Sequence, residues 1–203
     1  MDIWNIVTGA PLLICSTVAL ALILERFFYV SRKSGLGKAN NQQIFSALHE
    51  HKIDSALSIL EKSTTGYQFV VDELLHHKSS PKDVRDEAIK IMLVRYSNRL
   101  RRGLSGLTTI ASLAPMLGLL GTIIGLMRSF RDIGISKGPV DPSVIADGLW
   151  QALTTTAAGM IIAVFCVLFY ALIHSHIKRH LAEAADVLNH FSHCIQLEEV
   201  NHD

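Results

Sequence analysis

Polar side chains recur at helical spacing in an otherwise apolar stretch around residue 150. They stand at positions i, i+4, i+7 and i+8, with one more hydroxyl beside them: Asp147, Gln151, Thr154, Thr155 and Thr156. In a helix this spacing places side chains on one face. Hydroxyl and amide groups within a membrane either bond neighbouring helices together or border a water path. The spacing leaves both interpretations open. Neither bonding between helices nor bordering a water path involves covalent chemistry.

Only one side chain of this stripe can change its charge. Glutamine neither takes up nor releases a proton, so Gln151 can hydrogen-bond a water or a carboxylate but cannot relay protons. Asp147 can titrate and is therefore a candidate pathway residue. The alternative for Asp147 is an exposed acid that the dipole of a helix N-terminus favours. No Asp or Glu occurs in residues 148–177 or 103–127.

A second set of small residues precedes this stripe in the chain. Gly118, Gly121 and Gly125 follow one another at spacings of three and four, which predicts a narrow face where two membrane helices approach closely. Pro115 lacks a backbone N–H, so it frees the Ala111 carbonyl and permits a kink. The Thr122 hydroxyl can bond a carbonyl of its own helix or border a polar path.

Other reactive residue types in the chain form no recognisable site. The histidine pair His176 and His180 and the group around His190 lack further ligands, so they are expected to be solvated and no metal is predicted. Cys15, Cys166 and Cys194 do not form a disulfide framework. No phosphate-binding loop or nucleophile motif occurs. The net charge of +1 gives no basic surface for nucleic acid. We therefore expect neither an enzyme nor a cofactor.

Three apolar segments explain the 49% hydrophobic content of the chain. Residues 6–24, 103–127 and 148–177 contain no Asp, Glu, Lys or Arg. About 20 apolar residues in a helix cross a bilayer, and a membrane leaves no partner for open strands. The first segment lacks a preceding basic residue and a cleavage site, so we interpret it as a retained helix. The sequence predicts an all-α membrane protein with three transmembrane helices.

The remaining patterns divide the chain into helices and loops. Short amphipathic helices are expected between the first two spans, and a Ser80 cap with Pro81 predicts the start of a long helix that runs into the second span without interruption. The third helix is also expected to continue beyond the membrane. The predicted boundaries are 1–30 (first transmembrane helix), 31–80 (cytoplasmic helices), 81–131 (long helix with the second span), 132–142 (periplasmic loop), 143–196 (long helix with the third span) and 197–203 (tail).

Basic residues are distributed asymmetrically about the spans. Residues 31–102 hold thirteen of the 19 Lys and Arg, whereas 1–25 hold none. Cytoplasmic loops carry the excess of positive charge, so residues 31–102 and the C-terminus are expected inside and the N-terminus in the periplasm. Arg95, Arg99 and Arg102 form a basic ridge beside the second span, which is expected to contact anionic lipid headgroups.

Two motifs carry a resemblance to a known family. The first is Ala-Pro-Met-Leu-Gly-Leu-Leu-Gly-Thr-Ile-Ile-Gly-Leu-Met at residues 114–127, and the second is Gln-Ala-Leu-Thr-Thr-Thr-Ala-Ala-Gly-Met at 151–160. A weaker match is the apolar run of residues 20–29 that ends in Glu-Arg-Phe-Phe-Tyr. In order, spacing and topology the chain resembles the ExbB/TolQ/MotA family of ion-channel subunits, and is most similar to its ExbB-like members.

The resemblance implies a ring, a homopentamer, in the bacterial inner membrane. The ring would surround helices of an ExbD/TolR/MotB-like single-span partner and couple proton or sodium flow to work on a periplasmic protein such as a TonB-like one. The resemblance places Thr122, Gln151, Thr155 and Thr156 along the ion pathway, and Asp147, one turn nearer the outside, is the further candidate on this chain. It places the titrating carboxylate on the partner.

The chain departs from the family pattern at two points. Gln151 stands where the family usually has a glutamate, and Ala-Val-Phe-Cys at 163–166 replaces Ala-Ile-Pro-Ala. The missing carboxylate leaves a rival interpretation open, in which the ring is a non-conducting scaffold that organises a partner protein or lipid. The sequence decides neither the ion, the partner nor the energised process.

Overall fold

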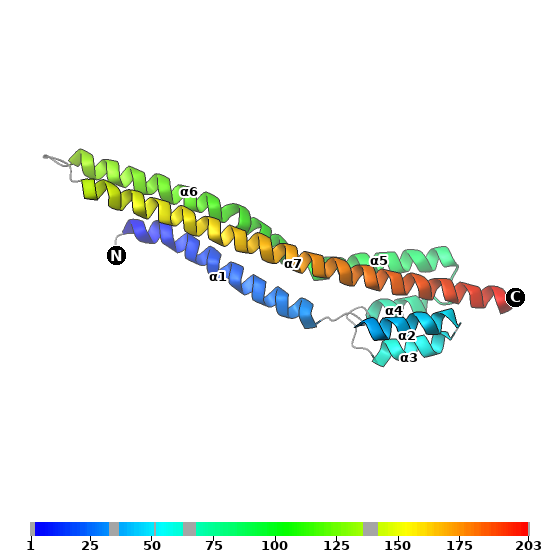
Figure 1. Ribbon diagram of the computed structural model, residues 1–203. Helices are drawn as coiled ribbons and strands as arrows, with labels where there is room; N and C mark the ends of the chain where they lie inside the picture. The colour runs from blue at the N-terminus through cyan, green and yellow to red at the C-terminus, as the bar shows by residue number, and fades with distance from the viewer. Residues whose placement is uncertain (1–2, 33–36, 51, 63–67, 136–141, 203) are drawn as a thin grey trace. The chain divides into compact units, whose positions relative to one another are not determined.

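The chain folds almost entirely into helices. The computed structural model describes residues 3–32, 37–50, 52–62, 68–135 and 142–202, and none of these lies in a β-strand. The expected all-α class is confirmed. The helices follow one another in the order shown in Figure 1: α1 (Ile3–Arg32), α2 (Gly37–His49), α3 (Ile53–Lys62), α4 (Gln68–His76), α5 (Lys82–Arg101), α6 (Leu104–Ile135) and α7 (Pro142–His202).

Three of these helices are long and apolar enough to cross a membrane. The qualifying segments are Gly9–Val30 of α1, Leu104–Ile135 of α6 and Ile145–Leu197 of α7, and most of their side chains are not buried inside the chain. The three-span prediction is confirmed by length and composition. With 61 residues, α7 is about 90 Å long, three times the hydrocarbon core of a bilayer.

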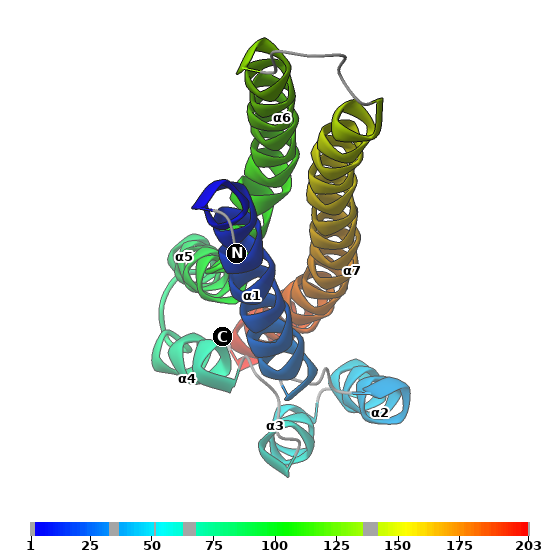
Figure 2. The same cartoon turned by 90° about the vertical axis from the view of Figure 1, so that its left-hand side faces the viewer.

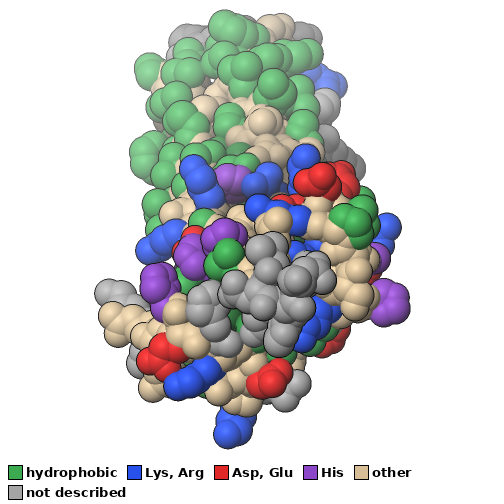
Figure 3. Space-filling view, turned by 90° about the vertical axis from the view of Figure 1, so that its right-hand side faces the viewer, with side chains coloured by type: hydrophobic (Ala, Val, Ile, Leu, Met, Phe, Trp, Pro, Cys, Tyr) green, Lys and Arg blue, Asp and Glu red, His purple; other side chains and the backbone are tan. Residues whose placement is uncertain are grey.

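The chain divides into two compact units. The first comprises Met1–Arg26 and Gly103–Leu172, and the second comprises Phe27–Arg102 and Ile173–Asp203. Within the second unit α2 pairs with α3 and α4 pairs with α5, as Figure 2 shows. Charged and histidine side chains are spread over the face of the second unit in Figure 3. The second unit therefore has the surface of a water-exposed helical bundle.

The predicted uninterrupted helix over 81–131 is wrong. Helix α5 ends at Arg101, α6 begins at Leu104, and Gly103 between them has φ +87°. Glycine adopts positive φ without a steric cost. A Cβ atom at Gly103 would also lie 2.8 Å from Nε of Arg26, so the position has no room for a side chain. The sequence does contain the signal, because arginines followed by glycine are typical of a helix C-terminus.

Several predicted boundaries also shift. Pro81, not Ser80, is the N-cap of α5, and no side chain caps this helix. Helix α6 ends at Ile135, beyond the predicted end at residue 131, and α7 extends from Pro142 to His202, which makes α7 longer than predicted. The expected helices between the first two spans are present as α2, α3 and α4. Of the predicted loop at 132–142, residues 136–141 lie outside the described residues.

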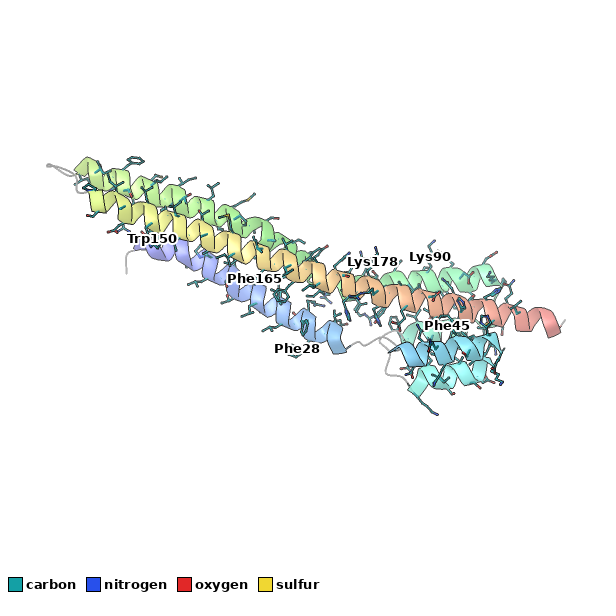
Figure 4. The ribbon with its side chains drawn as sticks, in the orientation of Figure 1. Phe28, Phe45, Lys90, Trp150, Phe165 and Lys178 are labelled. Atoms are coloured by element: carbon teal, nitrogen blue, oxygen red, sulfur yellow. The ribbon has the colours of Figure 1, made fainter. Side chains whose placement is uncertain are left out.

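Apolar side chains from every helix of the second unit form its core. Leu48 of α2, Leu60 of α3 and Leu74 of α4 are almost completely buried, as are Leu188 and Phe191 of α7. Phe45, labelled in Figure 4, packs edge-on against the ring of His190 with centroids 4.8 Å apart. The end of α7 is thus part of this core.

A fully buried arginine joins three segments of the second unit. Nη1 of Arg85 donates to the carbonyls of Lys78 at 3.0 Å and Ser80 at 3.2 Å. Its Nε and Nη2 donate to the hydroxyl and carbonyl of Ser192, at 3.2 and 3.1 Å. The Ser192 hydroxyl in turn donates to Oδ1 of Asp86 at 2.5 Å. A buried charge is tolerated because its donors are bonded in this way.

Replacement of Arg85 by methionine should strongly destabilise the second unit. The substitution leaves the Lys78, Ser80 and Ser192 carbonyls without their donor, and each buried acceptor left unsatisfied costs about 1–3 kcal/mol. Arg95→Met, on the exposed side of the same helix, is the matched control. Thermal unfolding of the purified protein in detergent should show a lower Tm for Arg85→Met only. Equal shifts in both variants would contradict this account.

Candidate ion-pathway site

Helices α6 and α7 contact each other through their backbones. A Cβ atom at Gly118 would lie 2.9 Å from Cα of Thr156, and one at Gly125 would lie 2.9 Å from Cβ of Ala152. Real Cβ atoms do not approach other atoms so closely, so only glycine fits at these positions. Close approach of this kind gives membrane helices the van der Waals contact on which their association depends.

Helix α7 contributes small residues to the same contact. Gly159 lies against the carbonyl of Ala114, and Gly148 lies against the hydroxyl of Ser129. The Ser129 hydroxyl also donates to the Gly125 carbonyl at 3.2 Å. These α7 glycines and Ser129 were missed by the sequence reasoning. The signal was present, because residues 148, 152, 155 and 159 follow the helical period.

Thr155 and Thr156 lie in this contact. The Thr156 hydroxyl donates to the Gly118 carbonyl of α6 at 2.8 Å, a bond between helices. The Thr155 hydroxyl donates to Ala152 of its own helix at 2.8 Å. A Cβ atom at Gly121 would lie 2.9 Å from the Cβ of Thr155. Both threonines are half-buried in the chain, so each keeps part of its surface for a further neighbour.

The other predicted pathway residues lie around these two threonines. Thr122 is half-exposed on α6, and its hydroxyl donates to the Leu119 carbonyl at 2.6 Å. Gln151 is half-buried one turn before Thr155, and Asp147 is exposed one further turn away. Thr154 is exposed and bonds its own helix. The structure therefore arranges one half-exposed α6 hydroxyl and three successive turns of α7 polar groups beside the glycine contact.

A proline lies inside α6, next to the contact with α7. Pro115 lies inside α6, directly after Ala114, whose carbonyl contacts Gly159. Proline removes one backbone hydrogen bond from the helix. On this turn the small Gly159 of α7 lies directly against the α6 backbone.

A buried polar pair lies in the second unit, outside this site. The Tyr96 hydroxyl and Nε2 of His180 share a hydrogen bond of 2.8 Å. Burial raises the pKa of the Tyr96 phenol, and nearby Tyr29 raises it further, while Arg99 opposes the change. The phenol therefore stays protonated and joins α5 to α7. It was not singled out from the sequence.

The geometry defines a class of protein: a three-span membrane protein with a polar layer on its third span, packed against a glycine-rich second span. Residues 58–185 match the model of the MotA/TolQ/ExbB proton channel family. The chain belongs to this family.

Named relatives agree with the match. The chain is 34% identical to biopolymer transport protein exbB1 of Vibrio cholerae over 184 residues, covering 89% of this chain and 80% of the relative. It is 34% identical to the putative ExbB-like 1 protein of Synechocystis, over 81% of this chain and 66% of the relative. It is 30% identical to a putative ExbB homologue of Methanothermobacter thermautotrophicus, over 76% of this chain and 54% of the relative.

Family membership establishes the general role. The chain is a multi-pass protein of the inner membrane and, in general terms, a subunit of an ion-driven motor. Its family is one of transport proteins and not of enzymes. The identification as an ExbB-like family member from the two motifs is confirmed.

Substitution of Gly118 by alanine should separate α6 from α7. The added methyl would collide with the Thr156 backbone, and the bond from Thr156 to the Gly118 carbonyl would lengthen. Gly134→Ala is the matched control on the same helix, because a Cβ atom there meets nothing within 4 Å. We expect a lower Tm in detergent for Gly118→Ala and an unchanged or higher Tm for Gly134→Ala, since alanine is the better helix former. A neutral Gly118→Ala would contradict the backbone contact.

Proposed function

We propose that the chain forms a homo-oligomeric ring, a pentamer by family resemblance, that conducts ions along the polar layer of α6 and α7. The supporting observation is the position of Thr155 and Thr156: they are half-exposed and lie against Gly121 and Gly118 of α6, in segments without any Asp, Glu, Lys or Arg. Polar groups at this depth border a water path or another polar surface. A single chain of this size encloses no pore, so a ring is required.

The ring surrounds helices of an ExbD/TolR/MotB-like single-span partner. Proton or sodium flow between ring and partner drives motion of the partner, which does work on a periplasmic protein such as a TonB-like one. The energy is about 2.3 kcal/mol per charge for each 100 mV of membrane potential. Because Gln151 cannot titrate, the partner supplies the carboxylate that binds and releases the ion.

The orientation follows the positive-inside rule. Residues 31–102, which hold thirteen of the 19 basic residues, lie in the cytoplasm with the C-terminus, and the N-terminus lies in the periplasm. Asp147 then lies near the periplasmic end of α7, where ions would enter. Arg95 and Arg99 lie at the cytoplasmic surface, where they contact anionic lipid headgroups.

A second candidate function is a non-conducting scaffold. The observation that favours it is Gln151 at the position where the family usually has a glutamate. A scaffold would assemble the same ring and bind the same partner without carrying ions. An ion-flux measurement on the complex distinguishes the two functions.

Removal of the Thr156 hydroxyl tests the conducting function. Thr156→Val keeps the shape of the side chain but removes the bond to Gly118, worth about 1 kcal/mol. Thr156→Ser keeps a hydroxyl and is the matched control. With the ring and its partner in liposomes under a membrane potential, a pH-sensitive dye and a sodium-sensitive dye should report flux for the wild type and Thr156→Ser, and a loss of about tenfold for Thr156→Val. Equal flux for Val and Ser would refute the role of the Thr156 hydroxyl, and no flux in the wild type would refute conduction.

Neutralisation of Asp147 tests where the essential carboxylate lies. If the partner holds it, Asp147→Asn should keep most of the flux, because the exposed acid serves only to attract ions near the entrance. The measurement is the same flux assay, with assembly checked by native mass spectrometry. An assembled Asp147→Asn complex without flux would place the relay on this chain instead.

A further inference from the structure

The exposed face of α6 changes its chemistry abruptly at Leu113. Between Leu104 and Ser112, every exposed side chain bears a hydroxyl: Ser105, Thr108, Thr109 and Ser112. From Leu113 to Phe130, every exposed side chain is large and apolar: Leu113, Met116, Leu119, Leu120, Ile123, Met127 and Phe130. The change occurs inside a segment that qualifies as a membrane span.

Helix α7 shows that the hydroxyl face lies at hydrocarbon depth. The contacts of Gly118 with Thr156 and of Ala114 with Gly159 align α6 and α7 antiparallel. Continued in this register, Thr108 lies level with the region of Phe165, which Figure 4 labels. Exposed α7 side chains around that level are apolar, such as Val164 at 65% and Leu168 at 50%. On this side of the unit the surface is typical of contact with lipid.

Helix α1 gives the same depth independently. Cδ1 of Leu22 would lie 3.0 Å from a Cβ atom at Gly106, between the α6 hydroxyls. Around that level α1 exposes Leu20 and Leu24, at 58% and 48%. Its one exposed hydroxyl nearby, Thr17, donates to carbonyls of its own helix. At the same level, exposed hydroxyls therefore cluster on the α6 face and not on α1.

The α6 hydroxyls donate their protons within the helix and keep their oxygen lone pairs on the exposed face. Thr108 and Thr109 donate to the Ser105 carbonyl at 2.8 and 2.9 Å, and Ser112 donates to the Thr108 carbonyl at 3.1 Å. Their protons are thus bonded within the helix, as for a solitary hydroxyl in lipid. Their oxygen lone pairs remain on the exposed face. Three such oxygens within about one turn of helix would go without donors in lipid, whereas water supplies donors to all of them.

We propose that this hydroxyl face, Ser105, Thr108, Thr109 and Ser112, is the wall of a water-filled vestibule that opens at the Arg102 end of α6. The vestibule extends as far as Ser112. The dry part of the α6 face then begins at Leu113. This inference rests on the proposed function in one respect, because it names where a conducted ion reaches water.

Residues 103–127 carry no charged side chain, so the vestibule wall offers only neutral groups to water and ions. Neutral hydroxyl oxygens bind water and do not trap a cation by charge, so an ion passes without a strong binding step. Water within the vestibule also raises the local dielectric, so the membrane potential falls mainly across the dry stretch that begins at Leu113.

Cysteine accessibility tests the vestibule directly. In a full chain whose native Cys15, Cys166 and Cys194 are replaced by serine or alanine, single cysteines replace Thr108, Thr109 or Ser112. The matched controls at similar depth are Thr17→Cys on α1 and Leu168→Cys on α7, and Met116→Cys lies further along α6. A charged, membrane-impermeant methanethiosulfonate is added to inverted vesicles that contain the complete complex with its partner.

The vestibule predicts that the three α6 cysteines react about tenfold or more faster than the three controls, because the reactive thiolate forms only in contact with water. Reaction at Ser112→Cys no faster than at Leu168→Cys would overturn the inference. So would equal reaction at Thr17→Cys, which would place the whole level at the membrane surface. The inference would also be overturned if the α6 cysteines were protected from the reagent only when the partner is present, because a partner helix would then cover this face of α6.

The outcome is separable from that of the proposed function. Thiol reaction rates do not require conduction, so fast labelling in a complex without ion flux would refute the conducting function and leave the vestibule standing. Ion flux in a complex whose α6 cysteines are not labelled would refute the vestibule and leave the conducting function standing.

Discussion

Backbone contact between α6 and α7 is the constraint on which the membrane unit depends. Within a bilayer no hydrophobic driving force holds helices together, so association rests on close packing and on hydrogen bonds between helices. Gly118, Gly121 and Gly125 meet Ala152, Thr155 and Thr156 without any intervening side chain. The Thr156 hydroxyl then reaches the Gly118 carbonyl at 2.8 Å, which a larger residue would prevent.

The threonine hydroxyls near this contact form hydrogen bonds that fix the direction of their protons. Each threonine near the contact satisfies its own proton on a carbonyl, either of α6 or of its own helix. The donors are therefore fixed, and oxygen lone pairs remain for water, an ion or a partner side chain. The same arrangement occurs at the other end of α6, where Thr108 and Ser112 bond their own helix and present their oxygens outward. A path built from acceptors suits a passing cation or a proton carried by water.

The sequence predicted the three spans and the close-packing glycines of α6, because both follow from composition and helical period. It did not predict the break at Gly103. At that break Gly103 has a positive φ, and the Arg26 side chain, 77 positions earlier in the sequence, lies beside it. Thr156 was predicted as a pathway residue, but its bond to Gly118 required the register between two helices. The buried position of Arg85 was not predicted either, because its partner Ser192 lies 107 positions away in the sequence.

A double-mutant cycle at Gly121 and Thr155 tests the central claim, that close packing positions the hydroxyl layer. A methyl at Gly121 would collide with the Thr155 side chain, whose Cβ would lie 2.9 Å away, and Thr155→Gly removes that side chain. The measurement is the thermal stability and ion flux of Gly121→Ala, Thr155→Gly and the double variant, each with the partner. The account predicts that the double variant is about 1–3 kcal/mol more stable than the sum of the single effects, while flux stays low because the hydroxyl is gone. Additive stabilities within about 0.5 kcal/mol, or restored flux without the hydroxyl, would contradict it.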